Sequence, residues 1–336
     1  MSPSSSLNSF NSSGHYSGSI KLGVSACLLG ERVRWDGNHK RNRYLTDVLS
    51  RYFSWVTVCP EVEAGMGAPR EPVHLMKDNG VRRLVAEESG KDWTSPMARL
   101  TRQRISELKA EGISGFIFKS KSPSCGLVRI PVILPPAAGE GRHIIRREAG
   151  LFAARFQDGC PLIPVTDEER ISDPATRDNF LGRVLAHHRL QTLWTGRFSF
   201  KALVRFHTEH QFLVLAHSRK HLAALDRLVS LRKPGRASAI RDRYGRLFME
   251  AFNLKATVHK HTAVLRRMTG FLQGKLSPLE RQDLREAVEA YYLGQAPRAV
   301  ALTLIRRLAR KFEVENLSCQ VYLNPHPIEW MVCGRI

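Results

Sequence analysis

Apolar and polar positions alternate in two different ways along the chain. Between Ile20 and Val165, short β-prone apolar runs alternate with segments of helical periodicity, which is the pattern of a parallel α/β sheet. From about Phe200 onward, long helical patterns follow one another without a convincing strand. The sequence therefore predicts an α/β protein in which an N-terminal parallel-sheet (Rossmann-like) domain is followed by a C-terminal all-α helical domain.

Within the first half, four apolar runs predict strands and three periodic segments predict helices. The run Leu127–Leu134 is also apolar but contains Pro131, which cannot donate to a ladder, so we expect an edge strand or a loop there. The predicted strands are Ile20–Ala26, Trp55–Val58, Ile113–Phe118 and Leu162–Val165, and the predicted helices are Asn42–Tyr52, Pro96–Glu111 and Ala149–Asp158.

The second half reads as four helices and an irregular tail over Leu317–Trp330. Ser277, Pro278 and Glu280 form the pattern of a capping box with proline at the first helical position, which marks the start of the third helix. The four predicted helices are Leu203–Leu231, Ala237–Leu272, Ser277–Gly294 and Pro297–Phe312.

Composition divides the chain further. Residues 1–18 are rich in Ser, Asn and Gly without an apolar core, which predicts a disordered tail and not a signal peptide. Residues 167–199 are polar and contain Pro174, which suggests a linker. The expected domains are therefore residues 19–166 and 200–336.

The net charge of +21 is unusually high for a chain of 336 residues. There are 28 basic and 20 acidic residues before Lys201, against 24 basic and 11 acidic residues from Lys201 onward. This concentration favours a polyanionic partner over simple solubility. Nucleic acid is favoured over a membrane, because no apolar run approaches the ~18 residues that span a bilayer. We therefore expect no membrane partner and a cytoplasmic location, where cysteines stay reduced.

Three cysteines occupy comparable places in the predicted sheet. Cys27, Cys59 and Cys125 each lie just beyond the end of a predicted strand, and the carboxyl ends of parallel strands share one rim. Structural zinc usually takes four ligands in close pairs, which this half lacks. Three thiolates on a 4Fe–4S cluster would leave one iron open as a Lewis acid. The alternative is three unrelated core thiols.

The other three cysteines are weaker candidates. Cys160 precedes its predicted strand, which places it on the opposite rim of a parallel sheet. Cys319 and Cys333 belong to the helical half and are incidental in this interpretation.

Candidate acid–base groups lie beside the three cysteines. Glu61, two positions after Cys59, could activate water or carry a proton, although it could equally begin a helix or form an ion pair. The hydroxyl groups of Ser122, Ser124 and Ser25 are close in sequence to the cysteines, but loop serines often only cap turns. Arg70 is either a substrate clamp or a surface charge.

The motifs around these residues resemble the thiouracil desulfidase family. They are Val24-Ser25-Ala26-Cys27-Leu28-Leu29-Gly30, Cys59-Pro60-Glu61-Val62 through Gly67-Ala68-Pro69-Arg70, and Lys121-Ser122-Pro123-Ser124-Cys125-Gly126. The resemblance covers about Ile20 to Val165. It implies a 4Fe–4S cluster held by Cys27, Cys59 and Cys125, whose open iron accepts sulfur from a thiolated pyrimidine base. It also implies Glu61 as the catalytic carboxylate and Ser122 as the catalytic serine.

The helical half, from Phe206 to Trp330, resembles a second family of formerly unknown function. When fused behind the desulfidase domain, this combination is similar to tRNA 4-thiouridine desulfidases, in which the helical part is thought to serve RNA binding. Histidines and cations on two predicted helices are the candidate contacts; the alternatives are a solvated helix face or a histidine metal site. The candidates are His207, His210, Lys220, Arg241, Arg243, Lys255, His259 and Lys260.

The function that the sequence predicts is removal of sulfur from 4-thiouridine in tRNA, giving uridine and hydrosulfide. One alternative is desulfidation of free thiouracil-type bases. Another is an iron–sulfur RNA-binding regulator without turnover, which would have no use for Glu61 and Ser122. A sulfur-inserting enzyme would need an ATP-activating P-loop, and the sequence has no G-x-x-x-x-G-K-[ST] motif.

Overall fold

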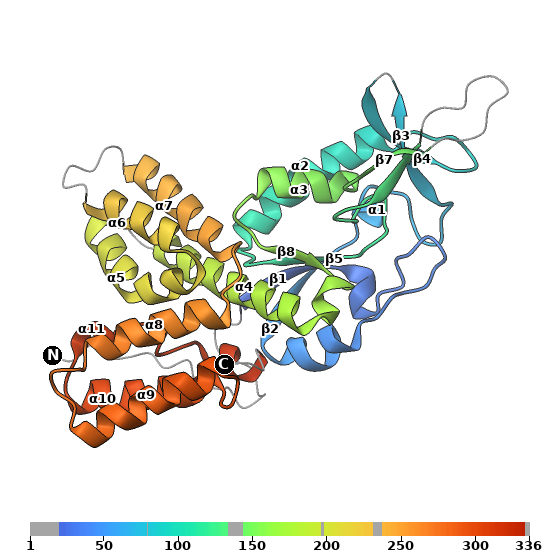
Figure 1. Cartoon of the computed structure of the whole chain (residues 1–336). Helices are drawn as coiled ribbons and strands as arrows, with labels where there is room; N and C mark the ends of the chain where they lie inside the picture. Colours follow the sequence, from blue (N-terminus) through green and yellow to red (C-terminus); the bar gives the residue numbers. More distant parts are fainter. Residues whose placement is uncertain (1–19, 79, 134–143, 196–197, 231–236, 333–336) are drawn as a thin grey trace, which may run out of the picture. The chain divides into compact units, whose positions relative to one another are not determined.

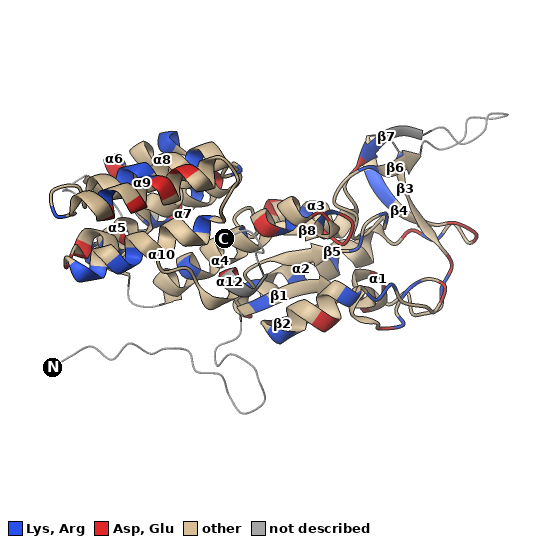
Figure 2. Cartoon of the chain, turned by 60° about the horizontal axis from the view of Figure 1, so that its bottom comes forward, with Lys and Arg blue, Asp and Glu red and all other residues tan. Residues whose placement is uncertain are grey.

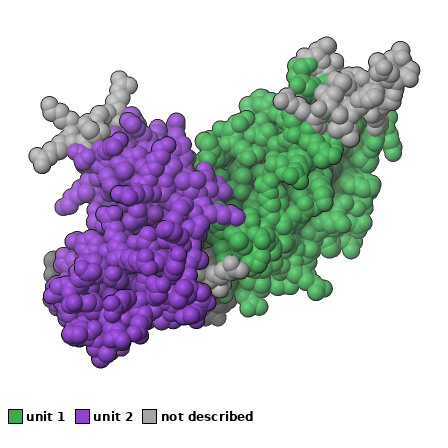
Figure 3. Space-filling model, viewed as in Figure 1, with its two compact units in different colours: residues 1–180 green, residues 181–336 purple. Residues whose placement is uncertain are grey.

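The computed structural model describes residues 20–78, 80–133, 144–195, 198–230 and 237–332. The chain forms two compact units, Met1–Phe180 (unit 1) and Leu181–Ile336 (unit 2), shown in Figure 3. The predicted disordered tail, residues 1–18, lies outside the described residues. Within the described ranges, every helix is too short or too polar to cross a bilayer.

Unit 1 contains the predicted parallel sheet. Its strand order is β2 (Phe53–Val58), β1 (Ile20–Ser25), β5 (Phe116–Phe118) and β8 (Val165–Asp167), and every neighbouring pair is parallel. Helices α2 (Thr94–Ala110) and α3 (Leu151–Gly159) pack together on one face of this sheet (Figure 1). Phenylalanines from β5 and α3 form the centre of the core: Phe116, Phe118, Phe152 and Phe156. The predicted α/β class is confirmed.

A second sheet in unit 1 was not expected. Its order is β4 (Val81–Ala86), β3 (Val73–Asp78), β6 (Ile130–Ile133) and β7 (Ile144–Glu148). The expectation of an edge strand or loop around Pro131 is wrong, because β6 lies between β3 and β7. Pro131 is tolerated there because it is opposite Arg147 of β7, while pairing with β3 begins one residue later, at Val132.

Two other segments of unit 1 and its boundary differ in detail from the sequence expectation. The predicted helix Asn42–Tyr52 is a π-helical turn, Tyr44–Val48, followed by a 3-10 turn, Leu49–Arg51, and α1 (Pro60–Glu63) follows β2. The expected linker contains the 22-residue helix α4 (Pro174–Thr195). A proline at the first helical position suits a helix start, which explains why Pro174 does not mark a loop.

Unit 2 is helical throughout its described residues. Its core gathers apolar side chains from α5, α8, α9 and α10. The predicted capping box at Ser277 is confirmed, with the hydroxyl accepting the Glu280 N–H and the carboxylate accepting the Ser277 N–H. The helices are α5 (Phe200–His217), α6 (Arg219–Ser230), α7 (Ala237–Phe252), α8 (Val258–Gly270), α9 (Pro278–Tyr292), α10 (Arg298–Lys311), α11 (Glu315–Ser318) and α12 (Pro327–Val332).

Two long predicted helices of unit 2 are each broken in two. Ser218 is extended, and its hydroxyl accepts the His221 N–H at 3.2 Å, so a new helix begins after it. Thr257 caps α8 in the same way by accepting the Lys260 N–H. The break also separates the histidines of this segment, with His207, His210 and His217 on α5 and His221 on α6.

Candidate active site

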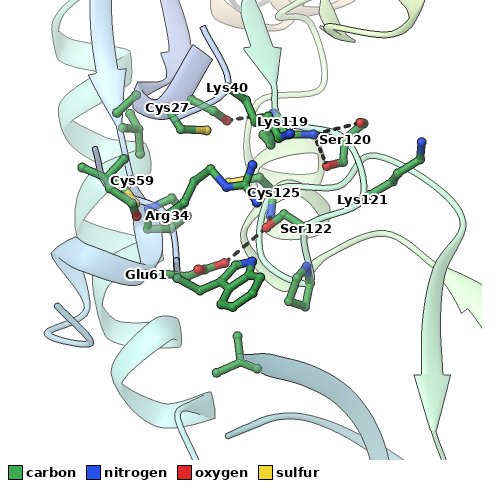
Figure 4. A pocket seen from close by; sticks show the side chains of 18 of the residues that line it. Cys27, Arg34, Lys40, Cys59, Glu61, Lys119, Ser120, Lys121, Ser122 and Cys125 are labelled. Atoms are coloured by element: carbon green, nitrogen blue, oxygen red, sulfur yellow. Dashed lines mark hydrogen bonds between the residues drawn. The ribbon is translucent and has the colours of Figure 1, made fainter. Parts of the chain in front are cut away.

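The three cysteines after β1, β2 and β5 line one cavity of about 410 Å³ in unit 1 (Figure 4). Cys27 lies in the 3-10 turn Ala26–Leu29 after β1, Cys59 follows β2, and Cys125 lies in the loop after β5. Because these strands are parallel neighbours, their carboxyl ends meet at one rim, and the expected convergence is confirmed. Their role as ligands stays a prediction.

The loop that carries Cys125 is fixed by the first turn of α3. Leu151 N–H donates to the Pro123 carbonyl at 3.0 Å, and the Phe152 and Ala153 N–H groups donate to the Ser124 carbonyl at 3.0 and 3.1 Å. These donors have no partner inside their own helix, so the loop satisfies them. A side chain at Gly126 would place its Cβ 2.2 Å from Ile130 Cδ1. Glycine is thus required where the loop leaves Cys125.

The three thiols lie in a poorly solvated setting. Burial raises the pKa of the Cys27 thiol to about 12, and burial also raises the pKa values of Cys59 and Cys125. All three thiols are free of disulfides. A buried thiol gives up its proton only when a positive charge, such as a metal centre, stabilises the thiolate. The donor set therefore suits a positively charged inorganic group.

The kind of group follows from the arrangement of the donors. Among the described residues, no three His, Cys, Asp or Glu side chains are grouped so as to chelate a single metal ion. An iron–sulfur cluster differs, because each thiolate binds a different iron and the donors surround a larger volume. Three cysteines around one cavity of about 410 Å³ fit a cluster better than a single ion.

Glu61 is held in the cavity wall between Arg70 and Ser122. Arg70 binds one carboxylate oxygen, Oε2, through both Nε (3.1 Å) and Nη2. The other oxygen, Oε1, accepts the Ser122 hydroxyl at 3.2 Å. The Arg70 side chain is only 7% exposed, and its Nη1 also donates to the Val33 and Gly67 carbonyls. Arg70 is therefore not a surface charge, and its guanidinium group positions Glu61.

The Ser122 hydroxyl is oriented by the backbone of its own loop. Its oxygen accepts the Ser124 N–H at 3.2 Å and the Cys125 N–H at 3.1 Å. With both acceptor positions occupied, the hydroxyl proton is left to the Glu61 carboxylate (Figure 4). This arrangement suits the transfer of a proton between the cavity and Glu61.

A second polar network in the wall was missed by the sequence reasoning. Lys119 Nζ pairs with Glu168 Oε1 at 2.5 Å, and the same carboxylate accepts the N–H and hydroxyl of Ser120 at 2.7 Å each. The charge of Lys119 opposes the burial that raises the Cys27 pKa. The signal available in the sequence was the position of Glu168, directly after the last parallel strand, β8.

The remaining cysteines lie elsewhere. Cys160 is buried and does not line the cavity, as expected. Cys319 is exposed in unit 2, and Cys333 lies outside the described residues.

Two of the candidate RNA contacts in unit 2 are buried, which corrects the sequence expectation. His207 is hydrogen-bonded to Asp226 at 2.9 Å and to Tyr244 at 3.2 Å, and His210 to the Phe206 carbonyl at 2.7 Å. Both rings pack inward because they lie on the face of α5 that contributes to the core. Neither is placed to contact a nucleic acid.

The other candidate RNA contacts, the lysines, the arginines and His259, are nearer the surface. Lys260 differs from the other candidate cations because its Nζ is committed to protein partners. It donates to the His217 and Lys255 carbonyls at 2.8 Å each and so links α5 to α8. Lys255 lies in the turn before α8 and not on a helix face shared with His259. The exposed candidates are Lys220, Arg241, Arg243, Lys255 and His259.

Comparisons with known proteins agree with this division. Residues 22–168 match the model of the 2-thiouracil desulfurase family, and residues 211–327 match a family described as protein of unknown function (DUF1722). The uncharacterized protein YbbK of Bacillus subtilis is 30% identical over 109 residues, which cover 31% of this chain and 71% of YbbK. The uncharacterized protein YbgA of Escherichia coli is 24% identical over 151 residues, 45% of this chain and 89% of YbgA.

A solved structure is also similar. The [4Fe-4S]-dependent thiouracil desulfidase TudS shares 30% identity, covering 46% of this chain and 93% of its own, with a TM-score of 0.35. The chain belongs to the 2-thiouracil desulfurase family, and its helical region is of the DUF1722 type, as the sequence resemblance predicted.

Proposed function

We propose that this protein is an iron–sulfur-dependent desulfidase that converts 4-thiouridine in tRNA to uridine and hydrosulfide. The observation that carries the proposal is the convergence, on one cavity, of three unpaired cysteines with the hydrogen-bonded pair of Glu61 and Ser122. A structural metal site needs thiol ligands but has no need of a proton-accepting carboxylate beside them. The presence of both in the same cavity supports catalysis.

In this proposal, Cys27, Cys59 and Cys125 hold a 4Fe–4S cluster. A cluster with three protein ligands supplies one open iron, which acts as a Lewis acid towards a soft donor such as the thiocarbonyl sulfur. The chemistry is hydrolytic: water provides the oxygen at C4, the sulfur leaves as hydrosulfide, and no electron is gained or lost overall.

Glu61 and Ser122 move the protons of this reaction. Glu61 accepts a proton from the attacking water at Oε1, the oxygen to which the Ser122 hydroxyl donates at 3.2 Å. Arg70 keeps the carboxylate in place by occupying Oε2, which leaves Oε1 for proton transfer. By donating its one hydroxyl proton to Oε1, Ser122 holds this oxygen in place for the transfer.

The choice of tRNA as substrate rests on charge. The residues from Lys201 onward carry 24 basic against 11 acidic side chains, and Lys and Arg are spread over the helices of unit 2 (Figure 2). We propose Lys220, Arg241, Arg243, Lys255 and His259 as contacts to the phosphate backbone, since all are exposed. A base inside a folded RNA must be flipped out to enter the cavity.

A free thiouracil-type base is the second candidate substrate, and the name of the matched family favours it. A non-catalytic regulator is disfavoured, because the buried Glu61–Arg70–Ser122 arrangement would serve no purpose in a sensor.

Anaerobic incubation of cluster-reconstituted protein with thiolated tRNA and, separately, with free thiouracil tests the proposal. The thiocarbonyl's near-ultraviolet absorbance should disappear in the tRNA sample. Loss only in the free-base sample would transfer the proposal to the second candidate, and loss in neither would refute both.

A further inference from the structure

A second cavity, of about 570 Å³, adjoins the catalytic cavity in unit 1. Ser120 and Lys121 line both cavities, which makes the two cavities neighbours. The other walls come from the loop after Cys125, from β7 and from the segment that follows β8. No step of the proposed reaction uses this second cavity.

Cations outnumber carboxylates in its lining. Lys121 pairs with Glu169 at 2.6 Å, and Arg170 pairs with Asp167 at 3.4 Å. Arg129 and Arg147 also line the cavity, and in the described part of the chain neither has an acidic partner. Two guanidinium groups without acidic partners in one hollow are suited to binding an oxyanion, because each guanidinium offers paired N–H donors to the oxygens of the anion.

The backbone at this cavity is strained. Lys121 and Arg129 have φ angles of 56° and 60°, in the left-handed region that favours glycine. Among the described residues, Glu313 is the one other non-glycine residue with a positive φ. Such conformations tend to persist where they serve a ligand site. Here both of them belong to cations that line the same hollow.

Lys121 is also available to a ligand, although it is paired with Glu169. The Lys121 and Glu169 side chains are 80% and 53% exposed, and exposed ion pairs contribute little to stability. Lys121 can therefore exchange the Glu169 carboxylate for a ligand that enters the hollow.

We propose that this hollow, the phosphate pocket, binds the phosphate of the nucleotide whose base occupies the catalytic cavity, with Arg129 and Arg147 as its principal ligands. A nucleotide carries its phosphate one ribose away from its base, and the two cavities are neighbours that share Ser120 and Lys121 in their linings. The inference rests on the proposed function and narrows it, because a free base cannot use this pocket.

The test compares affinities for ligands that differ only in phosphate. Uridine and uridine 5′-monophosphate are titrated calorimetrically into the reconstituted protein, its Arg129→Gln/Arg147→Gln variant, and the control Arg51→Gln/Arg102→Gln. The control removes the same charge from two exposed arginines of unit 1 that line neither cavity. The pocket variant should lose about 10- to 100-fold in the ratio of monophosphate to uridine affinity, since hydrogen bonds to charged groups are lost.

A uridine trinucleotide without terminal phosphates distinguishes the two sources of phosphate. If the pocket variant loses affinity for the trinucleotide alone, the pocket binds an internal phosphodiester. If it loses affinity for the monophosphate alone, the pocket binds a terminal phosphate. Equal ratios in the pocket and control variants for both ligands would overturn the inference. The single variant Arg147→Gln repeats the test if the double variant does not fold.

Failure here is distinguishable from failure of the proposed function. Wild-type protein that desulfurates thiolated tRNA but binds uridine and its monophosphate equally keeps the function and loses the pocket. Protein that prefers the monophosphate through Arg129 and Arg147 but never releases sulfur keeps the pocket and loses the function.

Discussion

Both units gather chemically active side chains, but the two groups face different surroundings. In unit 1, Cys27, Cys59, Cys125 and the Glu61–Ser122 pair line an open cavity. In unit 2, the histidines of α5 turn inward and find protein partners. The difference comes from the elements that carry them: residues beyond the ends of parallel strands are presented to a rim, whereas residues on a packed helix face enter the core.

His210 shows how closely a histidine of α5 packs into the interior. His210 stacks on Phe206 with ring centroids 3.8 Å apart and is hydrogen-bonded to the Phe206 carbonyl. Burial lowers the pKa of His210 to about 3 and that of His217 to about 4. A cluster of histidines in a sequence is therefore a weaker sign of a site than three cysteines at strand ends.

The largest expected effect concerns the cysteines. Cys27→Ala, Cys59→Ala and Cys125→Ala should each abolish cluster retention and desulfidation, because each removes one of only three ligands. Cys160→Ala should keep both, since Cys160 is buried away from the cavity. Iron and acid-labile sulfide assays measure the outcome. Full cluster content in any of the first three variants would remove that residue from the site.

Glu61→Gln and Ser122→Ala should hold the cluster and lose turnover. Removing a positioned proton-transfer group typically lowers the rate by about 100-fold to 10,000-fold. Arg70→Gln should also slow the reaction, because it frees the carboxylate that Arg70 holds. Single-turnover rates under anaerobic conditions are the measurement. A Glu61→Gln variant with an intact cluster and a normal rate would exclude the carboxylate from the mechanism.

Acid should weaken unit 2 through its buried histidines. The folded pKa of His210, about 3, lies below the ordinary value of 6.5, so its stability contribution is complete above pH 6.5 and declines as pH falls towards 3. At pH 5 the loss is about 2 kcal/mol for such a group. Hydrogen exchange in α5, compared at pH 7 and pH 5, should show this loss of protection.

His210→Gln removes the titrating group, so the hydrogen-exchange protection of α5 should depend less on pH in that variant. The control His259→Gln changes an exposed histidine on α8 and should leave the dependence as in the wild type. Equal protection of wild-type α5 at both pH values would contradict the burial argument.

The smallest effect concerns the exposed cations of unit 2. Lys220→Ala/Lys255→Ala should flatten the slope of log affinity for tRNA against log salt by about 1.5, since each phosphate contact contributes about 0.7 to 0.9. Lys260 is left intact because it ties α5 to α8. The Arg51→Gln/Arg102→Gln protein is the matched control. An unchanged slope in the lysine variant would place the RNA surface elsewhere.

The sequence allowed the catalytic rim to be predicted because its residues follow recognisable strands. The second sheet was missed, although Asn79-Gly80 between two apolar stretches is a hairpin signal that could have revealed β3 and β4. The breaks at Ser218 and Thr257 were hidden because apolar periodicity continues through both caps.

Other features of the site depend on side-chain contacts that form only in the folded chain. The pairing of Lys119 with Glu168 joins loops 49 residues apart. The position of Glu168 after β8 indicates that its carboxylate lies near the rim, but it does not identify the partner. The partnership of Arg70 with Glu61 depends on the turn between them bringing the guanidinium back over the carboxylate.

The measurement that tests the account most directly is hydrosulfide release in an anaerobic single turnover. Reconstituted wild-type protein and its Cys125→Ala variant are each mixed with thiolated tRNA, and hydrosulfide and thiocarbonyl absorbance are followed together. Wild type should release hydrosulfide in step with the loss of absorbance, and the variant should release none. Two results would contradict the proposed function. One is wild-type protein that carries a full cluster yet leaves the thiocarbonyl intact, and the other is a Cys125→Ala variant that releases hydrosulfide as fast as active wild type.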